Sequence, residues 1–470
     1  MVKRITVLAL VLAVAAGTMF AGAHPGGIAR QLAMGGSGYS PATVGPNLVF
    51  NPFIYDDPAV MLLNPAYQNM YRDYAWMNIA GGAITSFNSA VDNGYGRQFA
   101  GVNFAFGKEL GLGANLSFDP SFTNFMVGQL ATFVNNFAGR PAQTGLRPID
   151  VFEAVASYDL GSLDVGFGFL YGWASNTSKS SSTPTPSVST DNELSARVLG
   201  FRLGMSMDMG GGSAFDASAA IRLDKATDNV RGTNGAGQPA NSGDYSASAT
   251  EIQVDGRLKL KMSNRVNFVP YVNFVTISGE PKQDAPATGV TALTNSVKVS
   301  ALLIGAGAGM EYKVGSFYFA GGVSFKSGKF KTESSTGGTT PATSTSTLTG
   351  TSFPQINLGM EWTLLDWLTG RLGYYRSFLS VKSKTETSGP AAGAGTTAES
   401  DTWFGNSNVV FGSYAGPDNS LITLGLGLRF GNFALDGTVS DEALRRGFGL
   451  VGSQDNINTF GYLTASYCFE

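Results

Sequence analysis

The sequence predicts an all-β fold, a transmembrane antiparallel β-barrel, from three observations. Many stretches in the last four hundred residues alternate between apolar and polar side chains. The chain is 43% hydrophobic but only 14% charged, against about 25% charged in typical soluble domains. Short turns alternate along the chain with long connections. Together these features are typical of strands that cross a bilayer with one face toward lipid and one toward a polar lumen.

The clearest strand is Glu251–Met262. Because successive side chains of a strand point to opposite faces, a period of two separates these residues into two sets. One set is apolar or glycine: Ile252, Val254, Gly256, Leu258, Leu260 and Met262. The other is polar and mostly charged: Glu251, Gln253, Asp255, Arg257, Lys259 and Lys261. Repetition of this pattern favours a closed sheet with lipid outside and water inside.

Composition excludes several classes of protein. Beyond the N-terminus no apolar run of about 18 residues occurs, which argues against helical membrane spans. A formal net charge of −3 gives no basic surface for nucleic acid. The chain has one histidine, His24, and one cysteine, Cys468, so most imidazole-dependent catalysis, metal binding and disulfide formation are ruled out. We therefore expect no enzyme activity, no catalytic residues, no metal and no cofactor.

The N-terminus predicts export. Residues 1–23 read as a signal peptide, with Lys3 and Arg4 before an apolar core and a small-residue cleavage pattern at Ala21–Ala23. Export of a barrel implies the outer membrane of a diderm bacterium. The C-terminal segment places Leu463, Ala465, Tyr467 and Phe469 on one face. This segment resembles the C-terminal strand that the barrel-assembly machinery recognises during biogenesis.

Residues 24–72 do not alternate, and two interpretations stay open for them: a plug in the lumen, or a leader that only enters the barrel. The segment has a Met34-Gly35-Gly36 run, an acidic stretch that ends in Pro58-Ala59, and Asn64, Pro65 and Ala66 just before the first strand. This order resembles the FadL family of outer-membrane transporters. The resemblance implies a 14-stranded barrel over residues 73–470, a hatch over 24–72 that contains Asn64, Pro65 and Ala66, and a monomer.

Two further sites follow from particular residues. Gly81 and Gly82 interrupt the first strand, as a bulge or bend would, and the resemblance implies a strand kink that opens toward the membrane. Residues 121–139 change to a helical period, which predicts a helix in an outer loop. Its apolar face would either bind a ligand or pack on the barrel rim, and it contains Phe122, Phe125, Met126, Leu130, Phe133 and Phe137.

The connections predict the strand number. Seven short turns, near residues 107–110, 160–163, 208–213, 262–265, 313–316, 364–366 and 431–432, give 16 strands if both termini are periplasmic, whereas the resemblance gives 14. Long external connections are expected between these turns. The Ser/Thr-rich segments Ser178–Thr190 and Thr332–Thr349 bury too little apolar surface to order themselves, so we expect them in flexible loops.

The function expected from the resemblance is passive uptake of hydrophobic small molecules, such as long-chain fatty acids, gated by the N-terminal hatch. The expected partners are outer-membrane lipid, the hydrophobic ligand and the assembly machinery, with no nucleic acid. Two alternatives remain: a general porin for polar solutes, and a barrel that serves as a partner in secretion or surface assembly.

Overall fold

The computed structural model describes residues 26–38, 49–80, 99–117, 151–182, 188–233, 243–286, 296–336, 342–389, 396–403, 420–439 and 460–469. In the described N-terminal residues there are three short helices and a two-stranded sheet: α2 (Ile28–Ala33), η1 (Pro58–Leu62), η2 (Pro65–Gln68), β1 (Ser37–Gly38) and β2 (Val49–Phe50). All later elements that the structure describes are strands of one closed barrel. Among the described residues, no helix is long and apolar enough to cross a membrane.

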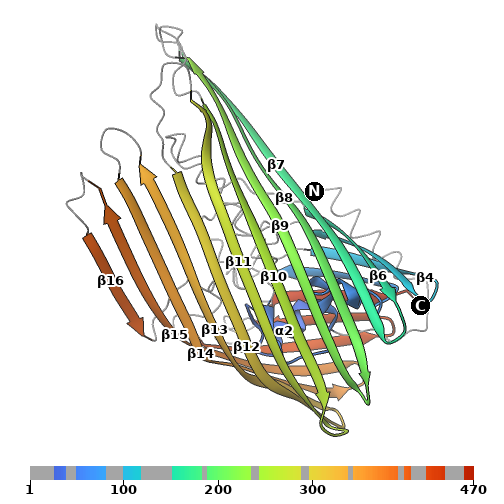
Figure 1. The fold of residues 1–470 in the computed structure, drawn as a ribbon. Helices are drawn as coiled ribbons and strands as arrows, with labels where there is room; N and C mark the ends of the chain where they lie inside the picture. The colour runs from blue at the N-terminus through green and yellow to red at the C-terminus, as the bar shows by residue number, and fades with distance from the viewer. Residues whose placement is uncertain are drawn as a thin grey trace, which may run out of the picture.

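The barrel strands fall into a short and a long group, and neighbours in the chain are antiparallel neighbours in the barrel. The short strands are β3 (Tyr74–Ala80), β4 (Phe99–Phe106), β5 (Leu110–Ser117), β6 (Val151–Asp159), β16 (Thr396–Trp403), β17 (Ser420–Phe430), β18 (Phe433–Val439) and β19 (Phe460–Cys468). The long strands are β7 (Leu163–Ser182), β8 (Val188–Gly210), β9 (Ser213–Thr233), β10 (Gly243–Lys261), β11 (Val266–Pro286), β12 (Ser296–Val314), β13 (Phe317–Thr336), β14 (Ala342–Leu365) and β15 (Leu368–Ser388). Figure 1 shows the long strands as one tall wall, with α2 inside the barrel.

These strands occupy sixteen positions, because β16 and β17 share one. β16 pairs with the outer part of β15, from Ser380 to Thr387, and β17 pairs with its inner part, from Leu368 to Arg376. The pairing of β19 with β3 closes the ring. The sixteen strands predicted from the seven turns are confirmed, and the fourteen implied by the family resemblance are wrong for this chain.

The two faces of the barrel have the polarity that the sequence predicts. On β10, Glu251 and Arg257 are 0% and 4% exposed, whereas Ile252 and Val254 are 39% and 44% exposed. Charged side chains therefore point inward and aliphatic side chains point outward, the reverse of a soluble protein. Such a surface is stable only in contact with lipid, so the barrel is a transmembrane barrel.

The polarity of both faces inverts in the outer half of the long strands. Beyond Ile252, the outward residues of β10 are Thr250 and Ser248, and the inward residues are Ala249 and Ala247. A tilted strand needs only about 9–11 residues to cross the bilayer, and β10 has 19. The outer half therefore lies beyond the hydrocarbon, where a polar exterior and an apolar interior are the stable arrangement.

The predicted flexible Ser/Thr-rich loops are largely strands, which corrects that expectation. All of Ser178–Thr190 except residues 183–187 lies in β7 or β8, and Thr332–Thr349 lies in β13 and β14 except for residues 337–341. Each strand pairs along its length with a neighbour, as Thr347 on β14 pairs with Lys331 and Lys384. Neighbours already anchored in the membrane supply the backbone hydrogen bonds, so ordering does not require burial of apolar side chains.

Candidate functional site: the interface between the N-terminal segment and the barrel wall

The described residues of the N-terminal segment lie inside the barrel and contact opposite sides of its wall. Helix α2 contacts β15, β17, β18 and β19, and helix η2 contacts β5, β6, β7 and β8. Most side chains of the segment are buried, including Phe53, Tyr55 and Tyr67, each at most 1% exposed. The described part of the segment therefore occupies space in the lumen between these two sides of the wall.

Two glycines allow the chain to enter α2. Gly26 and Gly27 have φ values of +152° and +102°, which glycine adopts without the strain that a side chain would cause. The N–H of Gly26 donates to Asp436 on β18 (2.9 Å), and the N–H of Gly27 donates to Asp57 (2.9 Å). A Cβ on Gly27 would overlap Thr464 of β19. The start of the segment is thus fixed to the wall through its backbone.

A buried ionic network ties α2 to the wall. Arg30 contacts Asp57 of the N-terminal segment (2.8 Å) and Glu361 on β14 (2.8 Å). Arg371 on β15 contacts the same Glu361 (2.6 Å) and also Asp436 (2.5 Å). Burial alone would lower the pKa of Arg30, but Glu361 and Asp57 hold that pKa well above its ordinary value. Arg30 therefore remains charged and bridges the two parts of the protein.

A second network lies on the opposite side, at β9 and β10. Arg257 donates to the carbonyl of Ile54 (3.0 Å) and to Asp216 (2.8 Å), and its guanidinium lies 4.9 Å from the ring centre of Tyr55. The hydroxyl of Tyr67 donates to the same Asp216 (2.7 Å). Burial, reinforced by the charge of Asp216, raises the pKa of Tyr67. Tyr67 therefore stays protonated as a hydrogen-bond donor.

The three residues predicted for the hatch lie at the start of η2. Asn64 is its N-cap, with Oδ1 accepting from the N–H of Ala66 (3.0 Å), and Pro65 is the first helical residue. The side-chain amide of Asn64 also donates to the carbonyls of Met205 on β8 (2.9 Å) and Ala217 on β9 (3.2 Å). The Asn-Pro-Ala sequence thus combines a helix start with a direct hydrogen bond to the barrel wall.

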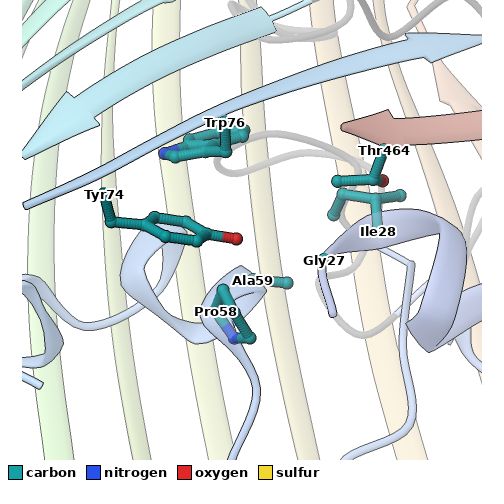
Figure 2. A pocket seen from close by; sticks show the side chains of 7 residues that line it. All are labelled: Gly27, Ile28, Pro58, Ala59, Tyr74, Trp76 and Thr464. Atoms are coloured by element: carbon teal, nitrogen blue, oxygen red, sulfur yellow. The ribbon is translucent and has the colours of Figure 1, made fainter. Parts of the chain in front are cut away.

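A small apolar cavity lies where the segment meets the seam between β19 and β3. Figure 2 shows the rings of Tyr74 and Trp76 facing Pro58 and Ala59, with Ile28 beside Thr464. This part of the interface has no ionic contact among its lining residues, in contrast to the two networks.

Sequence reasoning found the segment but not the residues that hold it. Arg30, Arg257 and Glu361 come from distant parts of the chain. For Arg257 and Glu361, the signal in the sequence is a charged residue on the inward face of a predicted strand. Arg30 has no such signal. Gly81, Gly82 and the six apolar residues of 121–139 lie outside the described residues, so the predicted kink and ligand face stay predictions. The same holds for the signal peptide.

The wall glycine Gly204 offers a test of this interface. A Cβ at Gly204 would overlap its nearest neighbours, Asn64 and Pro65, whereas a Cβ at Gly200 on the same strand would have ordinary contacts of 3.4 Å or more. We expect Gly204→Ala to displace η2 and raise ion conductance in planar bilayers, and Gly200→Ala to behave as the wild type. Equal conductance of the two variants would contradict the described packing.

The fold and this interface define the class: an outer-membrane β-barrel with an N-terminal segment packed in its lumen. No protein-family model matches the chain, and no curated protein matches it. The structure matches the toluene transporter TodX of Pseudomonas putida, a FadL-family protein, at 12% identity and a TM-score of 0.35 over 96% of this chain and 97% of that chain. It also matches the ferric-catecholate import receptor Fiu of E. coli K12 at 10% identity and a TM-score of 0.33, over 84% of this chain and 81% of that one. The ferric yersiniabactin receptor FyuA of Yersinia pestis matches at 9% identity and a TM-score of 0.33, over 84% and 79%.

Proposed function

We propose that this protein takes up a hydrophobic small molecule across the outer membrane, with the N-terminal segment as its hatch. One observation carries the proposal: the outer half of the lumen has an apolar inner face. Its buried members come from four adjacent strands, β9 to β12: Ala226, Ala247, Ala249, Val275, Ile277, Val299, Ala301 and Leu303. A pore for polar solutes has a polar interior, so an apolar inner face argues against that function.

The apolar face and the hatch lie on one path. On β10, the inward residue Arg257 contacts the hatch at Ile54, and the inward residue Ala249 belongs to the apolar face. Eight residues of strand separate them, or about 26 Å at about 3.3 Å per residue. A ligand that enters from outside would meet the apolar face first and the hatch second. The predicted helical face of residues 121–139, with Phe122, Phe125, Met126, Leu130, Phe133 and Phe137, would collect the ligand before it enters.

Release of the ligand requires the hatch to move. A ligand shifts such an equilibrium only if it binds the open arrangement more tightly than the closed one. Opening breaks the contacts of Arg30 with Glu361 and of Arg257 with Ile54, while the pairs Arg371–Asp436 and Arg257–Asp216 stay within the wall. The wall therefore keeps internal partners for its charges when the hatch leaves, which lowers the cost of opening.

The proposal is tested by placing a charge on the apolar face. Ile277 is 1% exposed and points inward, and the next residue, Ser278, is exposed and points outward. We expect Ile277→Asp to reduce uptake of oleate and toluene by cells about tenfold, because an unpaired carboxylate in an apolar surface is strongly unfavourable. The matched control, Ser278→Asp, should leave uptake unchanged.

Two outcomes would contradict the proposal. Rapid sucrose permeation through the full-length protein would identify a general porin instead. Unchanged uptake of both hydrophobic probes by a folded Ile277→Asp variant would remove the apolar face from the transport path.

A further inference from the structure

The outward face of β7, β8 and β9, which lie side by side in the tall wall (Figure 1), becomes polar at a sharp boundary. The last apolar residues of the lipid-facing band on these strands are Trp173, Leu199 and Leu223. On β7 the band ends in two aromatic residues, Tyr171 and Trp173, which are 45% and 61% exposed. Aromatic side chains at the edge of the apolar band mark the membrane interface. The outward residues that follow therefore lie at the level of the lipid headgroups.

Two cations occupy the first polar row of this face. Arg197 on β8 and Lys225 on β9 are direct cross-strand partners, and the partner of Arg197 on β7 is Trp173. Both basic side chains point outward, because the next residues along each strand, Ala196 and Ala226, are buried in the interior. Like charges directly opposite each other on neighbouring strands destabilise a sheet. A negative group close to both side chains would remove this repulsion.

The described carboxylates of this face lie too far away to be that group. Neither Arg197 nor Lys225 forms an ion pair with a residue that the structure describes. Lys225 pairs with Ser248 on β10, which pairs in turn with Glu280 on β11, so the backbones of Lys225 and Glu280 are about 10 Å apart. Glu193 lies four residues beyond Arg197 on β8, or about 13 Å along the strand. On the membrane side of the pair, the described outward residues of β7 to β10 include no carboxylate.

A row of hydroxyl groups follows the two cations. Ser195 on β8 pairs with Thr227 on β9, and their side-chain oxygens lie 2.6 Å apart in a hydrogen bond. Ser175 on β7 pairs with the same Ser195. From the membrane outward, the face thus presents an apolar band, a pair of cations and a hydroxyl row. Acyl chains, a phosphate group and the polar remainder of a lipid headgroup follow one another in the same order.

From this order of groups, we propose that the outward face of β7–β9 binds a phosphate group of an outer-leaflet lipid. Arg197 and Lys225 contact one phosphate together, since both side chains donate strong charge-assisted hydrogen bonds to such a group. The acyl chains lie against the apolar band, and the hydroxyl row contacts the rest of the headgroup. Because the site continues directly from the lipid-facing band, its ligand is a membrane lipid and not a free anion. This inference is independent of what the lumen transports.

The test measures lipid binding to the full mature protein in detergent by native mass spectrometry. The probes are diphosphorylated lipid A and the same lipid without phosphates. We expect the double variant R197Q/K225Q to bind the diphosphorylated lipid at least about tenfold more weakly, because each basic side chain near an anionic headgroup adds a favourable increment. Binding of the dephosphorylated lipid should match the wild type. The variant should stay folded, because it removes a repulsion between like charges on the surface.

The control variant K331Q/K384Q also removes two positive charges from the outer half of the barrel. These two lysines already have carboxylate partners, Glu333 and Glu386, so the control should bind both lipids as the wild type does. Binding of the diphosphorylated lipid by R197Q/K225Q at the wild-type level would overturn the proposal. So would an equal loss in the control variant, which would reflect net charge alone. Displacement of the lipid by millimolar inorganic phosphate would show recognition of a free anion and would also overturn it.

Discussion

Deletion of residues 24–72 is expected to turn a barrel of low conductance into an open aqueous channel. Barrels of sixteen to eighteen strands leave a water-filled lumen when nothing occupies it. In this protein, helices α2 and η2 contact opposite walls of that lumen. The wall that the described part of the segment covers is polar, with buried groups such as Asp216, Arg257 and Glu311, so water and ions would enter once the segment is gone.

The measurement is single-channel conductance in planar bilayers, with the mature full-length chain beside the deletion variant. We expect large, steady currents from the deletion variant and rare openings from the full-length chain. Insertion of both proteins is checked by their resistance to unfolding in detergent. A folded deletion variant that stays silent would show that other parts of the chain close the lumen, and steady current from the full-length protein would show that the segment does not close it.

Replacement of Arg30 by methionine is expected to have the second-largest effect. Arg30 joins Asp57 of the N-terminal segment to Glu361 of the wall, and its side chain is 9% exposed. Loss of one partner from a buried ion pair typically costs about 3–5 kcal/mol, because the remaining charge is left uncompensated. Glu361 keeps Arg371, so we place the loss at the lower end, about 3 kcal/mol. That loss corresponds to about a hundredfold higher open probability.

Lys259 provides the matched control for Arg30. It also joins the wall to the N-terminal segment, through Asp56 (3.0 Å), but the side chain of Asp56 is 54% exposed. An exposed pair of this kind contributes less than about 1 kcal/mol, so Lys259→Met should change the open probability less than about fivefold. Hydrogen exchange of the backbone amides in the segment from Asp57 to Leu62 reports directly on release of the N-terminal segment. Equal behaviour of the two variants would show that the buried network does not hold the hatch closed.

The sequence alone predicted the barrel, and its turns predicted sixteen strands, a number that the structure confirms. A period of two along Glu251–Met262 is a local property of the chain, because each side chain of a strand takes the opposite face from its neighbour. The seven short turns are equally local, and they predicted sixteen strands against the fourteen of the resembled family. The N-terminal segment also stood out in the sequence, since it lacks the alternation of every strand that follows.

Only the tertiary structure decided how the lumen is occupied and how far the wall extends. The pairing of Arg30 with Glu361 joins residues 331 positions apart, and no local pattern specifies such a pair. The Ser/Thr-rich segments were misjudged for the same reason. Their order comes from hydrogen bonds to neighbouring strands, which the composition of one segment does not reveal. Local periodicity thus fixes the face of each side chain, while closure of the sheet decides which faces meet.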